Sequence, residues 1–125
     1  GRYVQPTVVE LDGNDARHAR EEIFGPILAV IPVDSLKEAV AVANDTEYGL
    51  AASIFTANGS NAVRAARALR AGTVTVNSYG EGDATTPFGG YKQSGFGGRD
   101  KSVHAHDQYT QLKTIWIDIS GGEDL

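Results

Sequence analysis

The run ILAVIPV at residues 27–33 is a continuous apolar segment, the pattern expected of a strand that is buried on both faces. A strand of this kind needs helices beside it, and the next segment supplies one. Ser35 and Glu38 have the spacing of a capping box, and apolar residues recur on one helical face after them, which predicts a helix at about 35–45. A second apolar strand is then predicted at 51–56.

The same alternation continues towards the C-terminus. A second helix is predicted from the turn at 58–60 to about Leu69, and Gly72 has the position of a left-handed terminator. The residues that should face inward from this helix are Ala62, Ala65, Ala66 and Leu69. A third strand follows at 73–77. The order strand, helix, strand, helix, strand predicts an α/β fold with a parallel sheet and right-handed crossovers.

The flanking segments have weaker patterns. Residues 3–11 contain β-formers, but Pro6 restricts a strand there to an edge or a bend. A short helical turn is predicted at 16–22 and a short helix at 100–106. Residues 109–119 alternate as a long strand with both faces mixed, which favours pairing with another edge, including one on another subunit.

Composition excludes several kinds of function. The 125 residues carry a formal net charge of -5, which argues against a nucleic-acid partner. We expect no membrane span and, from the first residues, no signal peptide. The absence of Cys excludes a disulfide or a thiolate metal site within these residues. His104 and His106 lie two apart and suit a metal only weakly, so we predict no metal site.

Residues 87–98, PFGGYKQSGFGG, hold five glycines and two Phe, and we call them the glycine loop. Glycines interleaved with rings indicate a backbone that is folded tightly against buried aromatic side chains, although a tight crossing with no ligand has the same pattern. The loop follows the carboxyl end of the strand at 73–77, where ligands bind in open parallel sheets. It has no P-loop signature, and Asp100 stands where a dinucleotide motif needs Gly.

Five motifs in this order and spacing resemble the C-terminal quarter of the NAD(P)-dependent aldehyde dehydrogenases. They are EEIFGP at 21–26, Asn44 with YGLA at 48–51, GTVTVN at 72–77, PFGGYKQSG at 87–95 and KT at 113–114. The resemblance covers residues 1–119, with an additional Gly98 before Arg99 as a small departure. Within the family, the segments at 82–83, 99–102 and 112–117 resemble the γ-glutamyl-γ-aminobutyraldehyde dehydrogenases of putrescine breakdown.

The resemblance implies specific roles for residues of this chain. Glu22 would accept hydrogen bonds from the nicotinamide ribose hydroxyls of NAD or NADP, and Phe24 would contact the nicotinamide. Phe88 would line the aldehyde channel, and Tyr79 would lie near its mouth. For Tyr79, simple packing is an equal alternative. The family's nucleophilic Cys and its coenzyme-binding core precede the matched segment. The resemblance therefore implies a fragment that is inactive alone.

Glu81 and Asp83 would place two carboxylates at the channel mouth, beside glycines that widen it. Carboxylates there favour a cation, which predicts an aldehyde with a distant amine as the substrate. A solvated acidic loop is the competing interpretation.

By the resemblance, the chain divides into three parts: the end of the catalytic domain at 1–93, a returning loop and short helix at 94–108, and an oligomerisation strand and tail at 109–125. The parent protein would be a cytoplasmic homo-oligomer, either a dimer or a tetramer. The alternative is a non-catalytic fragment that serves only subunit interaction.

Overall fold

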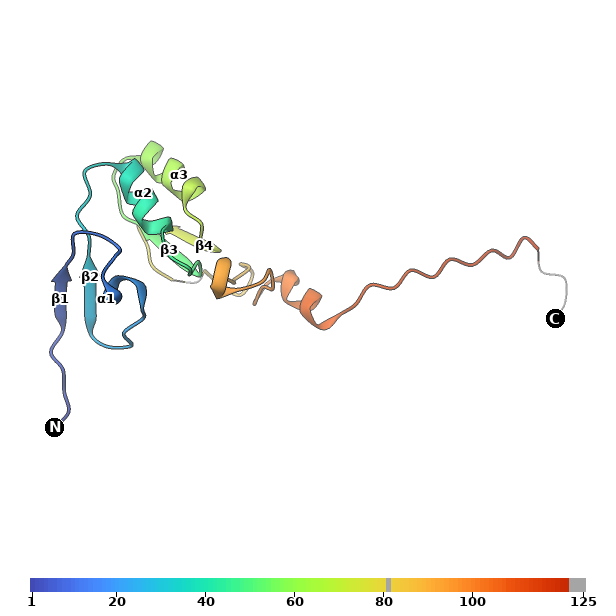
Figure 1. Cartoon of the computed structure of the whole chain (residues 1–125). Coiled ribbons are helices and arrows are strands. Elements are labelled where there is room, and N and C mark those ends of the chain that lie inside the picture. The colour runs from blue at the N-terminus through green and yellow to red at the C-terminus, as the bar shows by residue number, and fades with distance from the viewer. Residues whose placement is uncertain (81, 122–125) are drawn as a thin grey trace.

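The computed structural model describes residues 1–80 and 82–121 and shows short strands that alternate with helices (Figure 1). The strands and helices are, in order, β1 (Thr7–Glu10), α1 (Arg17–Arg20), β2 (Ile27–Val30), α2 (Leu36–Asn44), β3 (Ala51–Ile54), α3 (Gly59–Ala68) and β4 (Thr73–Val76). Two 3₁₀ helices follow, η1 (Lys92–Ser94) and η2 (Val103–Tyr109). The predicted alternation along the chain is confirmed.

The strands form two parallel pairs instead of the single sheet that we predicted. β1 pairs with β2 in a register that runs from Thr7 opposite Ile27 to Glu10 opposite Val30. β3 pairs with β4 from Ala51 opposite Thr73 to Ile54 opposite Val76. β2 is thus hydrogen-bonded to β1 and not to β3. Our prediction failed because sequence patterns indicate where strands lie but not which strands pair when they are far apart along the chain.

β2 is not buried on both faces as its apolar run predicts. Burial alternates along the strand, and Leu28 remains 59% exposed. The strand also ends at Val30, before Pro32, which lacks the N–H that a continuing ladder needs. A sheet of only two strands, β1 and β2, does not bury both faces of β2, so one apolar face of β2 stays exposed.

Both long helices begin as the sequence predicts. Ser35 Oγ accepts a hydrogen bond from Glu38 N at 3.1 Å, which caps α2, and Glu38 Oε2 accepts one from Asp34 N, the residue before the N-cap, at 2.9 Å. α3 packs on β3 and β4, and α2 packs on α3 (Figure 1). The inward residues Ala62 and Ala65 of α3 are 6% and 3% exposed.

The chain exposes 10497 Å² of surface. A compact protein of 13.2 kDa exposes about 6,400 Å². Ala62 and Ala65 are the buried hydrophobic residues among those the structure describes, so most apolar side chains face solvent. In the described part of the chain no helix is long and apolar enough to cross a bilayer.

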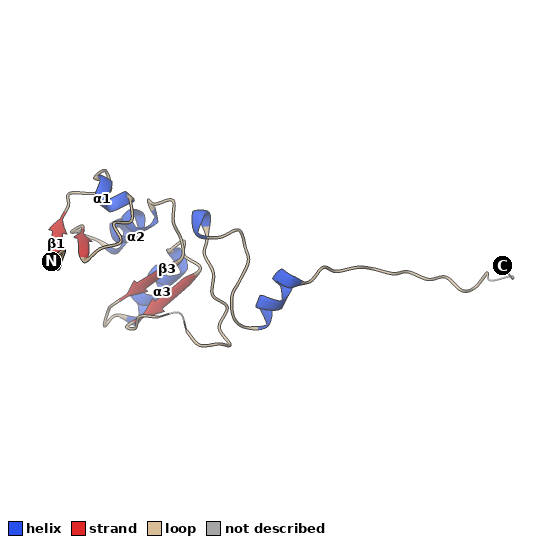
Figure 2. Cartoon of the chain, turned by 90° about the horizontal axis from the view of Figure 1, so that it is seen from below, coloured by secondary structure: helices blue, strands red, loops and turns tan. Residues whose placement is uncertain are grey.

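The C-terminal segment runs away from the folded part as an extended chain (Figures 1 and 2). The strand predicted at 109–119 is not formed: Tyr109 ends η2, and residues 110–119 have no ladder partner among the residues that the structure describes. An extended segment becomes a strand only when a neighbour accepts and donates its backbone hydrogen bonds. Leu112 and Trp116 are 101% and 90% exposed.

Candidate functional site

Glu22 and Phe24 follow α1 and lie in one cavity of about 250 Å³. Arg17 Nε donates to Glu21 Oε2 at 2.8 Å, so the neighbouring carboxylate is engaged. Within the residues that the structure describes, Glu22 has no hydrogen bond or ion pair, and both its oxygens are open to a ligand. The sequence therefore identified two residues that the fold brings together.

Phe24 has an unusual backbone conformation. Its φ is 53°, in the left-handed region, and its side chain is 90% exposed. For a bulky residue this conformation costs about 1–3 kcal/mol and is typical of functional sites. The strained backbone presents an aromatic ring to the same cavity that Glu22 lines.

Phe88 lies in the glycine loop and is half-buried. Its N–H donates to Asp100 O at 2.8 Å, and Asp100 N donates to Phe88 O at 2.7 Å, which closes the loop with an antiparallel bridge. Lys101 Nζ lies 5.5 Å from the Phe88 ring centroid, within the range of a cation–π contact. Phe88 lines a different cavity from that of Glu22 and Phe24, together with loop residues up to Asp100.

The predicted channel mouth is only partly described. Glu81 lies outside the described residues, and Tyr79 is 92% exposed. Asp83 Oδ1 accepts hydrogen bonds from Thr85 N at 2.8 Å, Thr85 Oγ1 at 2.6 Å and Thr86 Oγ1 at 3.3 Å. The bonds from Thr85 hold the pKa of the Asp83 carboxyl below its usual range, so Asp83 remains ionised near neutral pH.

The glycines serve close backbone contact. A Cβ on Gly72 would overlap the Gly89 carbonyl oxygen, and one on Gly90 would meet Ser94. The prediction that Gly72 terminates α3 is therefore wrong: the helix ends at Ala68, and Gly72 makes room for the glycine loop. The loop buries Gly90 but not both rings, since Phe96 is 100% exposed.

Sequence reasoning missed two polar residues that shape this region. Asn77 Oδ1 accepts from Thr56 N at 2.8 Å, and its Nδ2 donates to Thr56 O at 3.0 Å, which ties the carboxyl ends of β3 and β4 together. Lys92 Nζ donates to Asn44 O at 2.8 Å and to Thr46 O at 2.9 Å. The sequence features that could have identified these two residues are an Asn at the end of a predicted strand and a Lys within the glycine loop.

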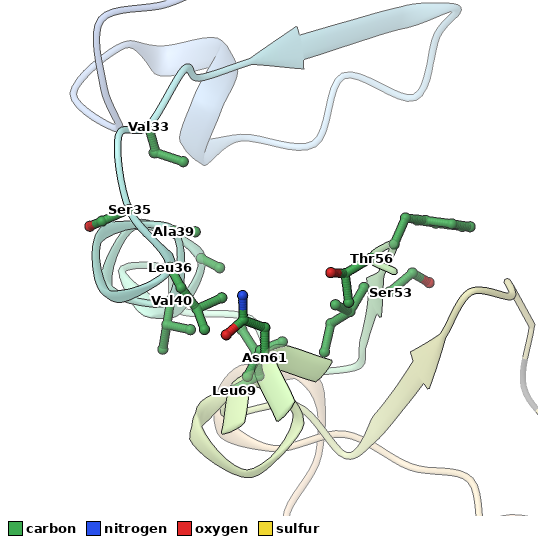
Figure 3. A pocket seen from close by; sticks show the side chains of 13 residues that line it. Val33, Ser35, Leu36, Ala39, Val40, Ser53, Thr56, Asn61 and Leu69 are labelled. Atoms are coloured by element: carbon green, nitrogen blue, oxygen red, sulfur yellow. The ribbon is translucent and has the colours of Figure 1, made fainter. Parts of the chain in front are cut away.

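A separate groove of about 390 Å³ lies between α2, α3 and β3 (Figure 3). Leu36, Ala39 and Val40 line it from α2, and Leu69 and Asn61 lie across from them. These are mainly the apolar helix faces that the periodicity predicted. We interpret the groove as helix-packing surface, because its lining holds no ionisable side chain.

Comparison with known proteins gives a consistent result. The profile of the aldehyde dehydrogenase family matches residues 1–115. The aminoacetaldehyde dehydrogenase of Pseudomonas aeruginosa PAO1 is 64% identical over 120 residues, which are 96% of this chain and 24% of that protein.

Two solved structures are similar as well. The indole-3-acetaldehyde dehydrogenase AldA of P. syringae, in complex with NAD+, matches with a TM-score of 0.87 and 58% identity over 94% of this chain and 23% of its own. The γ-glutamyl-γ-aminobutyraldehyde dehydrogenase of Burkholderia cenocepacia J2315 matches with a TM-score of 0.82 and 62% identity over 89% of this chain and 22% of its own. These matches confirm the predicted α/β class.

The chain spans about a quarter of the length of these relatives. The match nevertheless covers nearly all of its own residues, including both cavities described above. The chain belongs to the aldehyde dehydrogenase family.

Proposed function

We propose that this chain supplies part of the coenzyme site and of the aldehyde channel in an enzyme that oxidises an aldehyde to a carboxylate with NAD or NADP. NAD(P)+ would accept the hydride that leaves the aldehyde carbon. The observation that carries the proposal is the pairing, in a member of this family, of an open Glu22 carboxylate with the exposed Phe24 ring in one cavity. The nucleophilic thiolate would come from outside these residues, since they contain no Cys.

The residues fit a nicotinamide riboside. A carboxylate with two open oxygens accepts hydrogen bonds from two vicinal ribose hydroxyls, and charge strengthens both bonds. An aromatic wall fixes the plane of the ring that receives hydride. Phe88 would form an apolar wall that orients the aldehyde, with Tyr79 near the mouth, and water would supply the second oxygen of the carboxylate.

For the substrate we propose an aldehyde that carries an amine, as in polyamine breakdown. Two relatives have names that specify aminoaldehyde-derived substrates. Within the described residues, the three hydrogen bonds to the Asp83 carboxylate all end on Oδ1, which leaves Oδ2 for an ammonium group. Asp83 would thus offer one carboxylate, and Glu81 would add a second carboxylate to the mouth.

We further propose the division at 1–93, 94–108 and 109–125, with the last part as the oligomerisation strand of a cytoplasmic dimer or tetramer. Residues 122–125 lie outside the described part of the chain. The exposed apolar side chains of the extended segment at 110–119 support this assignment. The alternative, a fragment that serves only subunit interaction, would need the same exposed side chains.

The experiment is Glu22→Gln in the complete enzyme that contains this chain, with Glu21→Gln as the matched control. The amide keeps the size of the side chain but weakens its bonds to ribose hydroxyls, so we expect a loss in kcat/KM for the coenzyme of about tenfold or more. Glu21 lines the same cavity, but its carboxylate is paired with Arg17, so its variant should stay within about twofold of the wild type. Equal kinetics for the two variants would remove Glu22 from the coenzyme site.

A further inference from the structure

Backbone carbonyls at the end of α2 and just after it, within residues 42–46, accept hydrogen bonds from a lysine of the glycine loop. Lys92 Nζ donates to Asn44 O at 2.8 Å and to Thr46 O at 2.9 Å, and both bonds are partly buried. The last carbonyls of a helix lack partners inside the helix, and the negative end of its dipole favours a cation. Lys92 therefore closes the end of α2 with a charge of the right sign.

The backbone around Lys92 is held on both sides. Tyr91 N donates to Gly49 O at 2.8 Å, and Gln93 N donates to Glu47 O at 3.0 Å. Lys92 itself has φ 53°, a left-handed conformation that a long side chain adopts only when its surroundings impose it. The two carbonyl bonds of its ammonium are the interaction that this conformation allows.

The backbone between Lys92 and Phe88, the residue proposed for the channel wall, is tightly packed. Between them, Gly89 lies against Gly72 so closely that a Cβ on Gly72 would overlap the Gly89 oxygen, and Gly90 is buried. Phe88 is then fixed by its backbone bridge to Asp100. Because Gly89 and Gly90 have no free space in which to absorb a shift at Lys92, such a shift would strain the bridge that holds Phe88.

The same turn also binds the segment that precedes the coenzyme-side residues. Asn14 Nδ2 donates to Val42 O at 2.8 Å, and Arg20 donates to the Asp45 carboxylate at 3.0 Å. Arg20 ends α1, two residues before Glu22. The end of α2 is thus one anchor for two segments that line different cavities.

We propose that Lys92 is a positioning residue, which holds the Phe88 wall of the aldehyde channel in place by fastening the glycine loop to the end of α2. The inference rests on the proposed function, because Phe88 lines the channel only in an aldehyde dehydrogenase. Lys92 acts on the aldehyde side alone, since Asn14 and Arg20 hold the coenzyme side independently.

The test uses the complete enzyme with Lys92→Met, Lys92→Arg and the control Lys37→Met, which changes an exposed residue in the first turn of α2. We expect Lys92→Met to lower kcat/KM for 3-aminopropanal and propanal by about tenfold to a hundredfold, and to keep the Kd of NAD+ within about twofold. Lys92→Arg retains the charge with a different geometry and should lie between Lys92→Met and the wild type.

The outcomes separate the two ideas. A wild-type enzyme that oxidises no aldehyde overturns the proposed function, and the role of Lys92 with it. An active wild type whose Lys92→Met variant matches Lys37→Met overturns the role of Lys92 alone, as does an equal loss of coenzyme affinity and aldehyde kcat/KM. If Lys92→Met does not fold, Lys92→Arg is judged in its place: a raised aldehyde KM with unchanged NAD+ affinity supports the role, and an unchanged KM overturns it.

Discussion

Replacing Gly72 with Ala should be among the most damaging single-methyl changes in this chain. The new Cβ would overlap the Gly89 oxygen and lie 2.8 Å from the Gly89 carbonyl carbon and 3.3 Å from Gly90 Cα. All three obstacles are backbone atoms, so no side chain can rotate away. Gly72 cannot retreat freely either, because its N–H donates to Gly49 O at 3.0 Å.

The cost follows from these contacts. Overpacking a tight site costs about 1–3 kcal/mol, and the loss of one backbone hydrogen bond adds about 1 kcal/mol. We therefore expect Gly72→Ala to destabilise the protein by about 3 kcal/mol. Gly59→Ala is the matched control: Gly59 is the first residue of α3, has nothing within 4 Å of its Cβ position, and should gain up to about 1 kcal/mol from the better helix former.

The assay is the half-life of the complete enzyme at a fixed elevated temperature, because large oligomers unfold irreversibly. If the whole cost acts on the barrier to unfolding, about 3 kcal/mol shortens the half-life by about a hundredfold. The half-life of Gly59→Ala should equal or exceed that of the wild type. A Gly72→Ala enzyme as long-lived as the Gly59→Ala enzyme would refute the argument that the glycine loop needs this close approach.

Three further predictions concern assembly, the channel mouth and the strained ring. Deletion of residues 109–125 should shift the mass in light scattering to smaller species, and an unchanged oligomer would contradict the strand assignment. Asp83→Asn should reduce the preference for 3-aminopropanal over propanal, whereas an unaltered ratio would count against the acidic mouth. The same variant should flatten the acid limb of stability, because a carboxyl with a lowered folded pKa stabilises above its unfolded value of 3.8 and loses that contribution as the pH falls through the folded pKa. Phe24→Asn should raise stability by about 1 kcal/mol, since Asn tolerates left-handed backbone, and should slow hydride transfer; a less stable variant would remove the argument from strain.

Features that depend on neighbours along the chain were predictable. The cap formed by Ser35 and Glu38 spans three residues, and the inward face of α3 follows from helical periodicity through Ala62 and Ala65. The grouping of Glu22 with Phe24 was predictable for the same reason, because two residues of one short turn can hardly be separated. The exposure of Phe24 and its left-handed backbone were not encoded in any pattern that we used.

Features that depend on distant partners were not predictable. Which strand pairs with β2 is decided by packing, and β1 was only a weak candidate because of Pro6. Lys92 bonds to carbonyls 46 and 48 residues away, and backbone acceptors leave no mark in the sequence. The open apolar surface of β2 and of residues 110–119 has the same cause, since in the described chain β2 has one neighbouring strand and residues 110–119 have none.

Three of the five described non-glycine residues with positive φ, namely Phe24, Asn77 and Lys92, link these observations. All three are non-glycine residues with φ between 52° and 53°, and each follows or precedes a segment that we place at the coenzyme or channel side. Asn77 and Lys92 are held by hydrogen bonds within the chain, which is how such strain is normally sustained. Phe24 is exposed instead, and within this chain its ring makes little packing contact. A ligand that stacks on the ring, as we propose for the nicotinamide, would offset part of the cost of this strain.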